Sequence, residues 1–138
     1  MNIAMLKAQL SIDEGRKKRI YLDTVGKWTV GVGRNISDRD FSDDEIDLML
    51  NNDIDLVAGQ LDRHLPWWRQ MTDARQNVLA NMCFNVGVGR LLGFKNALAA
   101  MQAGRYDDAA KEMLDSQWAR QVGDRAFRLA TTMRSGRF

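Results

Sequence analysis

The chain is poor in the residues that build covalent cross-links and metal sites. Its 138 residues include one cysteine, one histidine and one proline. A single cysteine, Cys83, excludes a disulfide within the chain, and its apolar neighbours Met82 and Phe84 predict a buried, unreactive thiol. His64 is interpreted as a surface residue near a helix end rather than as a ligand or a base. A metal site would have to consist of carboxylates, so we expect none.

Long apolar runs are also missing. No stretch approaches the roughly 20 apolar residues that a membrane span requires. The first ten residues lack the apolar run after a basic start that marks a signal peptide. We therefore expect no stable membrane insertion and a cytoplasmic protein, which would need a separately made route to reach any target outside the cytoplasm. No Ser-His-Asp set and no phosphate-binding loop is present.

The composition that remains is that of a globular domain, with 45% hydrophobic and 28% charged residues. The net charge is only +2, but basic residues cluster in a run at 16–19 and near the C-terminal end. The second cluster consists of Arg120, Arg125, Arg128, Arg134 and Arg137. Such patches favour polyanions such as nucleic acid, acidic lipid or the bacterial envelope. The competing interpretation of each patch is a solvated surface.

The first 40 residues predict a short helix followed by a β-hairpin. Apolar residues recur at helical spacing over 3–13, and Gly15 is a suitable stop. Residues 20–22 and 28–33 are rich in β-branched, aromatic and glycine residues on either side of a turn, which is typical of a hairpin. Residues 34–40 are polar and are expected to be irregular.

A long helix is predicted over 43–64. Ser42 and Glu45 form a capping box at its start, and Pro66 ends it because the residue before a proline disfavours the α conformation. Beyond Pro66 the pattern is helical, with glycines breaking the chain at 87, 89 and 93. The helices expected there cover 72–84, 96–102, 107–114 and 125–133. Trp118 is expected in the helical core. Trp67 and Trp68 could stack on sugar rings, but loop packing between the lobes is the favoured interpretation.

These elements predict a mostly helical α+β fold in a single domain with two lobes. The N-terminal hairpin lobe covers about 12–42, the connecting helix about 43–64 and the helical lobe about 66–138, with residues 1–11 packed on the helical lobe. Clefts between lobes are common ligand sites.

Three residues of the hairpin lobe suggest chemistry. Glu14 stands at a helix end, Asp23 at the start of the hairpin turn and Thr29 on the returning strand. Glycoside hydrolysis uses two carboxyl groups, one of which donates a proton while the other is ionised, and a hydroxyl can help to hold the attacking water. With 18 acidic residues in the chain, spacing alone does not distinguish this pair from surface carboxylates.

The order of these residues resembles a known signature. Asp13-Glu14-Gly15 is followed after six residues by Leu-Asp-Thr, and after four more by Thr-Val-Gly-Val-Gly, which ends at Gly33. This string resembles the signature of phage lysozymes of the T-even type, glycoside hydrolase family 24: Glu, eight residues, Asp, five residues, Thr. Further segments similar to the family cover 81–87, 93–98, 105–110, 116–118 and 125–136.

The resemblance implies a two-lobed lysozyme-like fold and a muramidase that cleaves the β-1,4 bond between N-acetylmuramic acid and N-acetylglucosamine in bacterial peptidoglycan. It implies Glu14 as the acid, Asp23 as the second carboxylate and Thr29 as the hydroxyl that positions water, with inversion expected at the anomeric carbon. No cofactor is implied. We expect a monomer without a nucleic-acid partner, released like an endolysin through a separate membrane pore.

The resemblance also implies supporting roles in the second half of the chain. Phe84 and Asn85 match residues that line the cleft. Arg125 matches the arginine that pairs with the acidic helix end near Glu14. Asn81 matches the asparagine that bonds Asp13.

Two departures from the family concern the hairpin and the residue after it. Arg34 stands where the family often has a histidine, and we expect it to pair with Asp53 on the long helix. Val25 replaces a frequent glutamate, which removes one substrate contact. The connection from hairpin to helix is also shorter than in the longest members.

Two other functions compete with the muramidase. A lytic transglycosylase needs one glutamate and no carboxylate that activates water, so Asp23 and Thr29 argue against it. A non-catalytic wall- or nucleic-acid-binding module could use the arginine-rich C-terminal end, but it gives no reason for Glu14, Asp23 and Thr29 to occur together.

Overall fold

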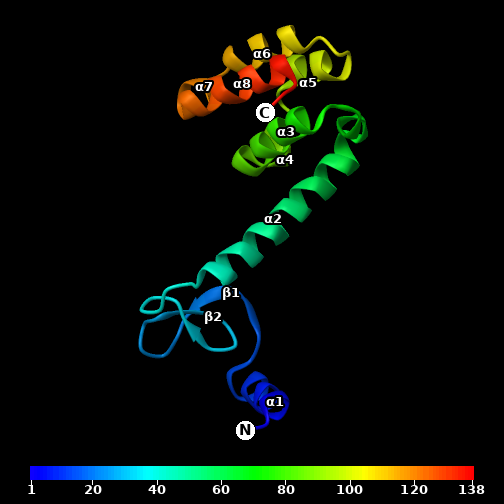
Figure 1. Ribbon diagram of the computed structural model, residues 1–138. Coiled ribbons are helices and arrows are strands. Elements are labelled where there is room, and N and C mark those ends of the chain that lie inside the picture. Colours follow the sequence, from blue (N-terminus) through cyan, green and yellow to red (C-terminus); the bar gives the residue numbers. More distant parts are fainter. The chain divides into compact units, whose positions relative to one another are not determined.

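The computed structural model of the protein describes residues 1–138 and divides them into two compact units, Met1–Leu48 and Met49–Phe138. Figure 1 colours the elements in chain order. Eight α-helices and a small antiparallel sheet of three strands confirm the predicted α+β, mostly helical class. The predicted lobe boundaries, and the packing of residues 1–11 on the helical lobe, concern the arrangement of the parts and stay predictions.

The N-terminal unit begins with helix α1 (Ile3–Glu14), as the apolar spacing predicts. The side chain of Asn2 caps its first turn by accepting the N–H of Met5 at 3.1 Å. Gly15 ends the helix with φ +75°, and its N–H donates to the carbonyl of Ser11. Glu14 is therefore the last helical residue, held where the chain turns toward the sheet.

The sheet of this unit has the order β1-β2-β3, with bounds Lys17–Leu22, Trp28–Gly31 and Arg34–Asn35. Strand β1 pairs with β2 through Tyr21 opposite Thr29 and is irregular toward Lys17. The expectation that residues 34–40 are irregular is wrong for its first two residues, which form β3 against β2. The turn through Gly31 and Gly33, both with positive φ, returns the chain along β2 and creates this third strand.

Helix α2 runs from Asp43 to His64, as predicted. The capping box is confirmed: the Ser42 hydroxyl accepts the N–H of Glu45 at 3.2 Å, and Glu45 accepts the N–H of Ser42 at 2.9 Å. Past the helix, Pro66 opens a short 3₁₀ helix, η1 (Pro66–Gln70), rather than a loop. His64 is exposed, as expected.

The C-terminal unit packs its remaining helices around one core. Their bounds are α3 Asp73–Val86, α4 Val88–Leu91, α5 Lys95–Gln102, α6 Tyr106–Leu114, α7 Gln117–Val122 and α8 Asp124–Ser135. Helix α6 packs against α5 and α8, and α3 packs against α8. Helices α4 and α7 were not predicted. The expectation that Gly89 breaks the chain is wrong, because it lies inside α4 with an ordinary negative φ.

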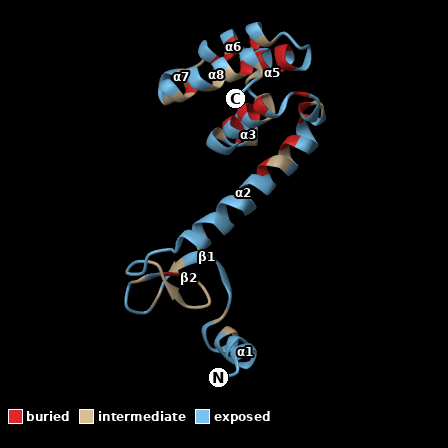
Figure 2. Ribbon diagram, viewed as in Figure 1, coloured by how far each residue is buried: buried red, intermediate tan, exposed pale blue.

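Burial divides sharply between the two units (Figure 2). The buried apolar residues lie in the C-terminal unit, among them Cys83 and Trp118, as predicted, and Trp68 of η1. The N-terminal unit has one buried residue, and it is polar: Thr29, with 4% of its surface exposed. Hydrophobic burial therefore stabilises the helical unit, whereas backbone pairing and polar contacts define the hairpin unit.

Two leucines of α2 provide a test of this core. Leu61 is fully buried and Leu56 is 61% exposed. Because each buried methylene contributes about 0.8 kcal/mol, Leu61→Ala should lower the free energy of unfolding by about 2 kcal/mol or more in urea titrations followed by tryptophan fluorescence. Leu56→Ala is the matched control and should change it by less than about 0.5 kcal/mol. Equal effects of the two substitutions would contradict the assignment of the core.

Candidate active site

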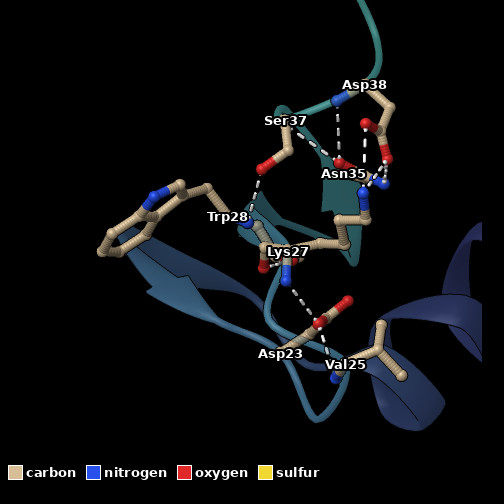
Figure 3. A network of polar contacts seen from close by, with 8 residues as sticks. Asp23, Val25, Lys27, Trp28, Asn35, Ser37 and Asp38 are labelled. Atoms are coloured by element: carbon tan, nitrogen blue, oxygen red, sulfur yellow. Dashed lines mark hydrogen bonds and ion pairs between the residues drawn. The ribbon is translucent and has the colours of Figure 1, made fainter.

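The turn between β1 and β2 is closed by the side chain of Asp23 (Figure 3). Its Oδ1 accepts the backbone N–H of Val25 at 2.9 Å and that of Lys27 at 2.8 Å. The N–H of Asp23 donates to the carbonyl of Lys27 at 2.9 Å. The other carboxylate oxygen, Oδ2, accepts no hydrogen bond from the protein. The turn therefore fixes the direction of the half-buried carboxylate and leaves one oxygen available.

Thr29 follows this turn on β2, next to the same peptide group. Its Oγ1 donates to the carbonyl oxygen of Lys27 at 3.0 Å. Since a hydroxyl has one proton and two acceptor lone pairs, this bond commits the proton of Thr29 and leaves its oxygen as an acceptor. Lys27 thus bonds both side chains through its backbone, with its N–H on Asp23 and its carbonyl on Thr29.

Glu14 reaches the second turn of the sheet. A Cβ built on Gly33 would lie 2.7 Å from Oε2 of Glu14 and 2.9 Å from its Cδ, so the carboxyl group lies directly against the glycine backbone. Gly33 has φ +64°, which also favours glycine. The end of α1 and the β2–β3 turn therefore hold Glu14 at the sheet.

The segment after β3 holds the Asp23 turn from outside (Figure 3). Asp38 forms an ion pair with Lys27, with Nζ 3.0 Å from Oδ2. Asn35 donates from Nδ2 to Asp38 and accepts the N–H groups of Ser37 and Asp38 on its Oδ1. The amide of Asn35 and the ammonium of Lys27 hold the pKa of Asp38 below its usual value, which keeps its carboxylate ionised.

Arg34 has a carboxylate partner that the sequence did not indicate. Its guanidinium contacts Glu45, the capping-box residue of α2, and its Cζ lies 5.7 Å from the ring centre of Phe41. These contacts tie β3 to the start of α2. The pairing of Arg34 with Asp53, an exposed residue of α2, would join the two units and stays a prediction.

In the C-terminal unit, Asn81, Phe84 and Arg125 line one largely apolar groove of about 430 Å³. Arg125 donates from Nε and Nη2 to Oδ1 of Asn81, at 3.0 and 2.7 Å. Phe84 is 47% exposed beside them. The bonds that the family resemblance implies from Asn81 to Asp13, and from Arg125 toward Glu14, cross between the units and stay predictions. Asp13 itself is exposed on α1.

Asn85, one residue further along α3, is held by the core tryptophan. Trp118 donates from Nε1 to Oδ1 of Asn85 at 2.8 Å. Trp118 also lines a polar depression of about 480 Å³ that contains both cations and acids. Its charged residues are Arg90, Lys95, Glu112 and Asp115. The amide NH₂ of Asn85 remains available as a donor.

The N-terminal unit therefore holds three candidate groups: a carboxyl group at a helix end against Gly33, a carboxylate with one available oxygen, and an acceptor hydroxyl bonded to the same residue as that carboxylate. A carboxylate and a hydroxyl that flank one point can accept the two protons of a water, and another carboxyl group can donate a proton. Sequence reasoning missed Gly33 and Lys27 as parts of this site. The glycines of the hairpin do not indicate which residue approaches them, and Lys27 acts through backbone atoms, which carry no sequence signal.

Comparisons with known proteins identify the family of the chain. The family described as phage lysozyme matches residues 11–134. The chain is 23% identical to a probable T4-type lysozyme 1 of Dictyostelium discoideum, over 97% of this chain and 96% of that protein. It is 28% identical to the pre-baseplate central spike protein Gp5 of Enterobacteria phage T4, over 98% of this chain and 28% of that protein. With its residues 11–134 matched, the chain belongs to the phage lysozyme family and is a glycoside hydrolase.

Proposed function

We propose that the protein is a muramidase that hydrolyses the β-1,4 bond between N-acetylmuramic acid and N-acetylglucosamine in bacterial peptidoglycan, with inversion at the anomeric carbon. The observation that carries the proposal is that the backbone of Lys27 holds both side chains. Its N–H binds Oδ1 of Asp23, which leaves Oδ2 available, and its carbonyl accepts the hydroxyl proton of the buried residue Thr29. A lone surface carboxylate would not be tied to a hydroxyl residue in this way. The pair suits the task of holding a water molecule.

The attacking water donates one proton to Thr29 Oγ1 and the other to Asp23 Oδ2, which leaves an oxygen lone pair directed away from both. As the new C–O bond forms at the anomeric carbon, the proton toward Asp23 transfers to its carboxylate. Asp23 thus acts as the general base. We call residues 23–29 the water-holding turn, because its side chains and backbone carry this function.

Glu14 donates its proton to the glycosidic oxygen that leaves, on the opposite face of the sugar. Its contact with Gly33 restricts where the carboxyl group can go and supports this role. Inverting enzymes keep their two carboxyl groups about 6.5–9.5 Å apart so that a water fits between sugar and base. The broken C–O bond keeps its electron pair on the leaving oxygen, which takes the proton of Glu14.

The glycan and its peptide need a second surface, and we assign it to the predicted residues of the C-terminal unit. The half-exposed ring of Phe84 can contact a sugar face, and the NH₂ group of Asn85 can donate to a carbonyl. Arg125, held by Asn81, adds a charged rim to the groove. We further propose supporting roles for Asp13 and for an Arg34–Asp53 pair that holds the hairpin against α2.

No helix of the chain has the length and apolarity that crossing a membrane requires. We propose that the enzyme works as a monomer without cofactor or nucleic acid, that it accumulates in the host cytoplasm, and that it reaches the wall through a pore made by another protein.

Removing the acid tests the mechanism first. Glu14→Gln should abolish nearly all clearing of chloroform-treated Gram-negative cells, since an amide cannot donate the proton and general acid catalysis is worth about 10²–10⁴-fold. Far-UV circular dichroism should match the wild type. Near-normal lysis by this variant would exclude Glu14 as the acid. Anhydro ends, rather than new reducing ends, in wild-type digests would identify a transglycosylase instead.

Gly33→Ala tests whether the position of Glu14 matters. Its Cβ would overlap the carboxyl group of Glu14, so the variant should lyse cells at least about tenfold more slowly, within the roughly 10²-fold that a displacement of about 1 Å can cost. Gly104→Ala is the matched control: it has φ +76° and open space around its Cβ, so it carries the backbone strain without the overlap. Equal losses in both variants would mean that strain alone is responsible.

Thr29→Val keeps the shape and β-branching but removes the hydroxyl. We expect a folded protein whose lysis rate falls by about tenfold or more, the lower part of what a positioned catalytic group contributes. NMR of early wild-type products should show the α-anomer. Normal lysis by Thr29→Val, or the β-anomer among early products, would disprove the assigned role of Thr29.

A further inference from the structure

The tip of the water-holding turn has little support from packing, although Thr29 at its end is buried. Thr24, Val25 and Gly26 at its tip are exposed, and a Cβ added at Gly26 would meet nothing within 4 Å. Apart from the pairing of β2 with β1 and β3, the turn is restrained by contacts of residues 35–38. The geometry of Asp23 and Thr29 therefore depends on these contacts.

Lys27 connects the restraining contacts of residues 35–38 to the side chains of Asp23 and Thr29. Its N–H binds the carboxylate of Asp23, and its carbonyl accepts from the hydroxyl of Thr29 and from the N–H of Asp23. A small rotation of this one residue would redirect both groups together. The side chain of Lys27 is the only part of it not engaged in the turn.

That side chain is anchored by Asp38, at 3.0 Å from Oδ2 and 3.3 Å from Oδ1. Asp38 in turn cannot swing freely, because Asn35 binds both its backbone N–H and its Oδ2. Beside this anchor, the hydroxyl of Ser37 accepts the N–H of Trp28 at 2.8 Å, and the N–H of Ile36 donates to the carbonyl of Trp28. Residues 35–38 thus hold the Lys27–Trp28 step by both its backbone and its side chain (Figure 3).

We propose that Asp38 is a positioning residue that orients the water-holding turn by anchoring the side chain of Lys27. In this role it does not act on the reacting atoms, and its effect passes through the backbone of Lys27 to the base and the hydroxyl. The inference rests on the proposed hydrolytic function. It makes catalysis depend on an exposed ion pair, an interaction that ordinarily contributes little to stability.

The test is a kinetic comparison on purified peptidoglycan, following the release of reducing ends. Asp38→Ala should lower kcat by about tenfold and leave KM within about twofold, because the water and not the glycan is misplaced. Asp38→Glu, which can still reach Lys27, should restore most of kcat. Asp108→Ala is the matched control, since Asp108 forms an exposed ion pair with Arg105 in the C-terminal unit, and it should change neither parameter.

Lys27→Met removes the other half of the anchor and should lower kcat to the same extent. The double variant Lys27→Met/Asp38→Ala should lose no more than either single variant, because both remove one interaction. The melting temperature of each variant is measured as well, to distinguish an effect on positioning from an effect on folding. Asp38→Asn supplies an isosteric variant if Asp38→Ala does not fold.

Unchanged kcat in Asp38→Ala, a fall in KM alone, or additive losses in the double variant would each overturn the positioning role. So would a kcat that falls only in step with the melting temperature and is not restored by Asp38→Glu. A wild-type protein that releases no reducing ends would instead overturn the proposed function, so the two failures are distinct.

Discussion

The N-terminal unit depends on one pair of hydrogen bonds, in which a carboxylate oxygen of Asp23 accepts two backbone N–H groups. This pair closes the turn between β1 and β2, and so determines where Thr29 returns along β2 and where β3 can pair. The same pair decides which oxygen of Asp23 remains for chemistry. One interaction therefore serves the fold and the site, because a carboxylate has two oxygens and the turn uses only one.

The contacts that define the N-terminal unit differ in kind from those that stabilise the helical core. In the C-terminal unit, many buried apolar side chains together stabilise the core. The effect of removing one of them is spread over the side chains that pack against it. In the N-terminal unit, each polar contact has a particular role: Gly33 admits Glu14, Glu45 serves both the capping box and Arg34, and Asp38 anchors Lys27. Such contacts are directional, so they specify geometry more than they add stability.

How far the sequence predicts the structure follows from the length and periodicity of its elements. Helix α2 was predicted with its bounds, because 22 residues carry a clear apolar spacing between a capping box and a proline. Helices α4 and α7 and strand β3 are too short to show a period. The ordered motif predicts Glu14, Asp23 and Thr29 as site residues. It does not predict their contacts with Gly33 and Lys27, because backbone donors and close approaches at glycine leave no residue-type signal.

The single buried residue of the N-terminal unit has a consequence for how the enzyme responds to heat. A segment with almost no buried apolar surface opens locally at a lower free energy than a segment with a packed core. The proposed catalytic residues lie in the unit that we expect to open first, and most of the helical residues lie in the other unit. We therefore expect inactivation on warming to precede the loss of helical structure, so that a protein that has lost its activity is still largely folded.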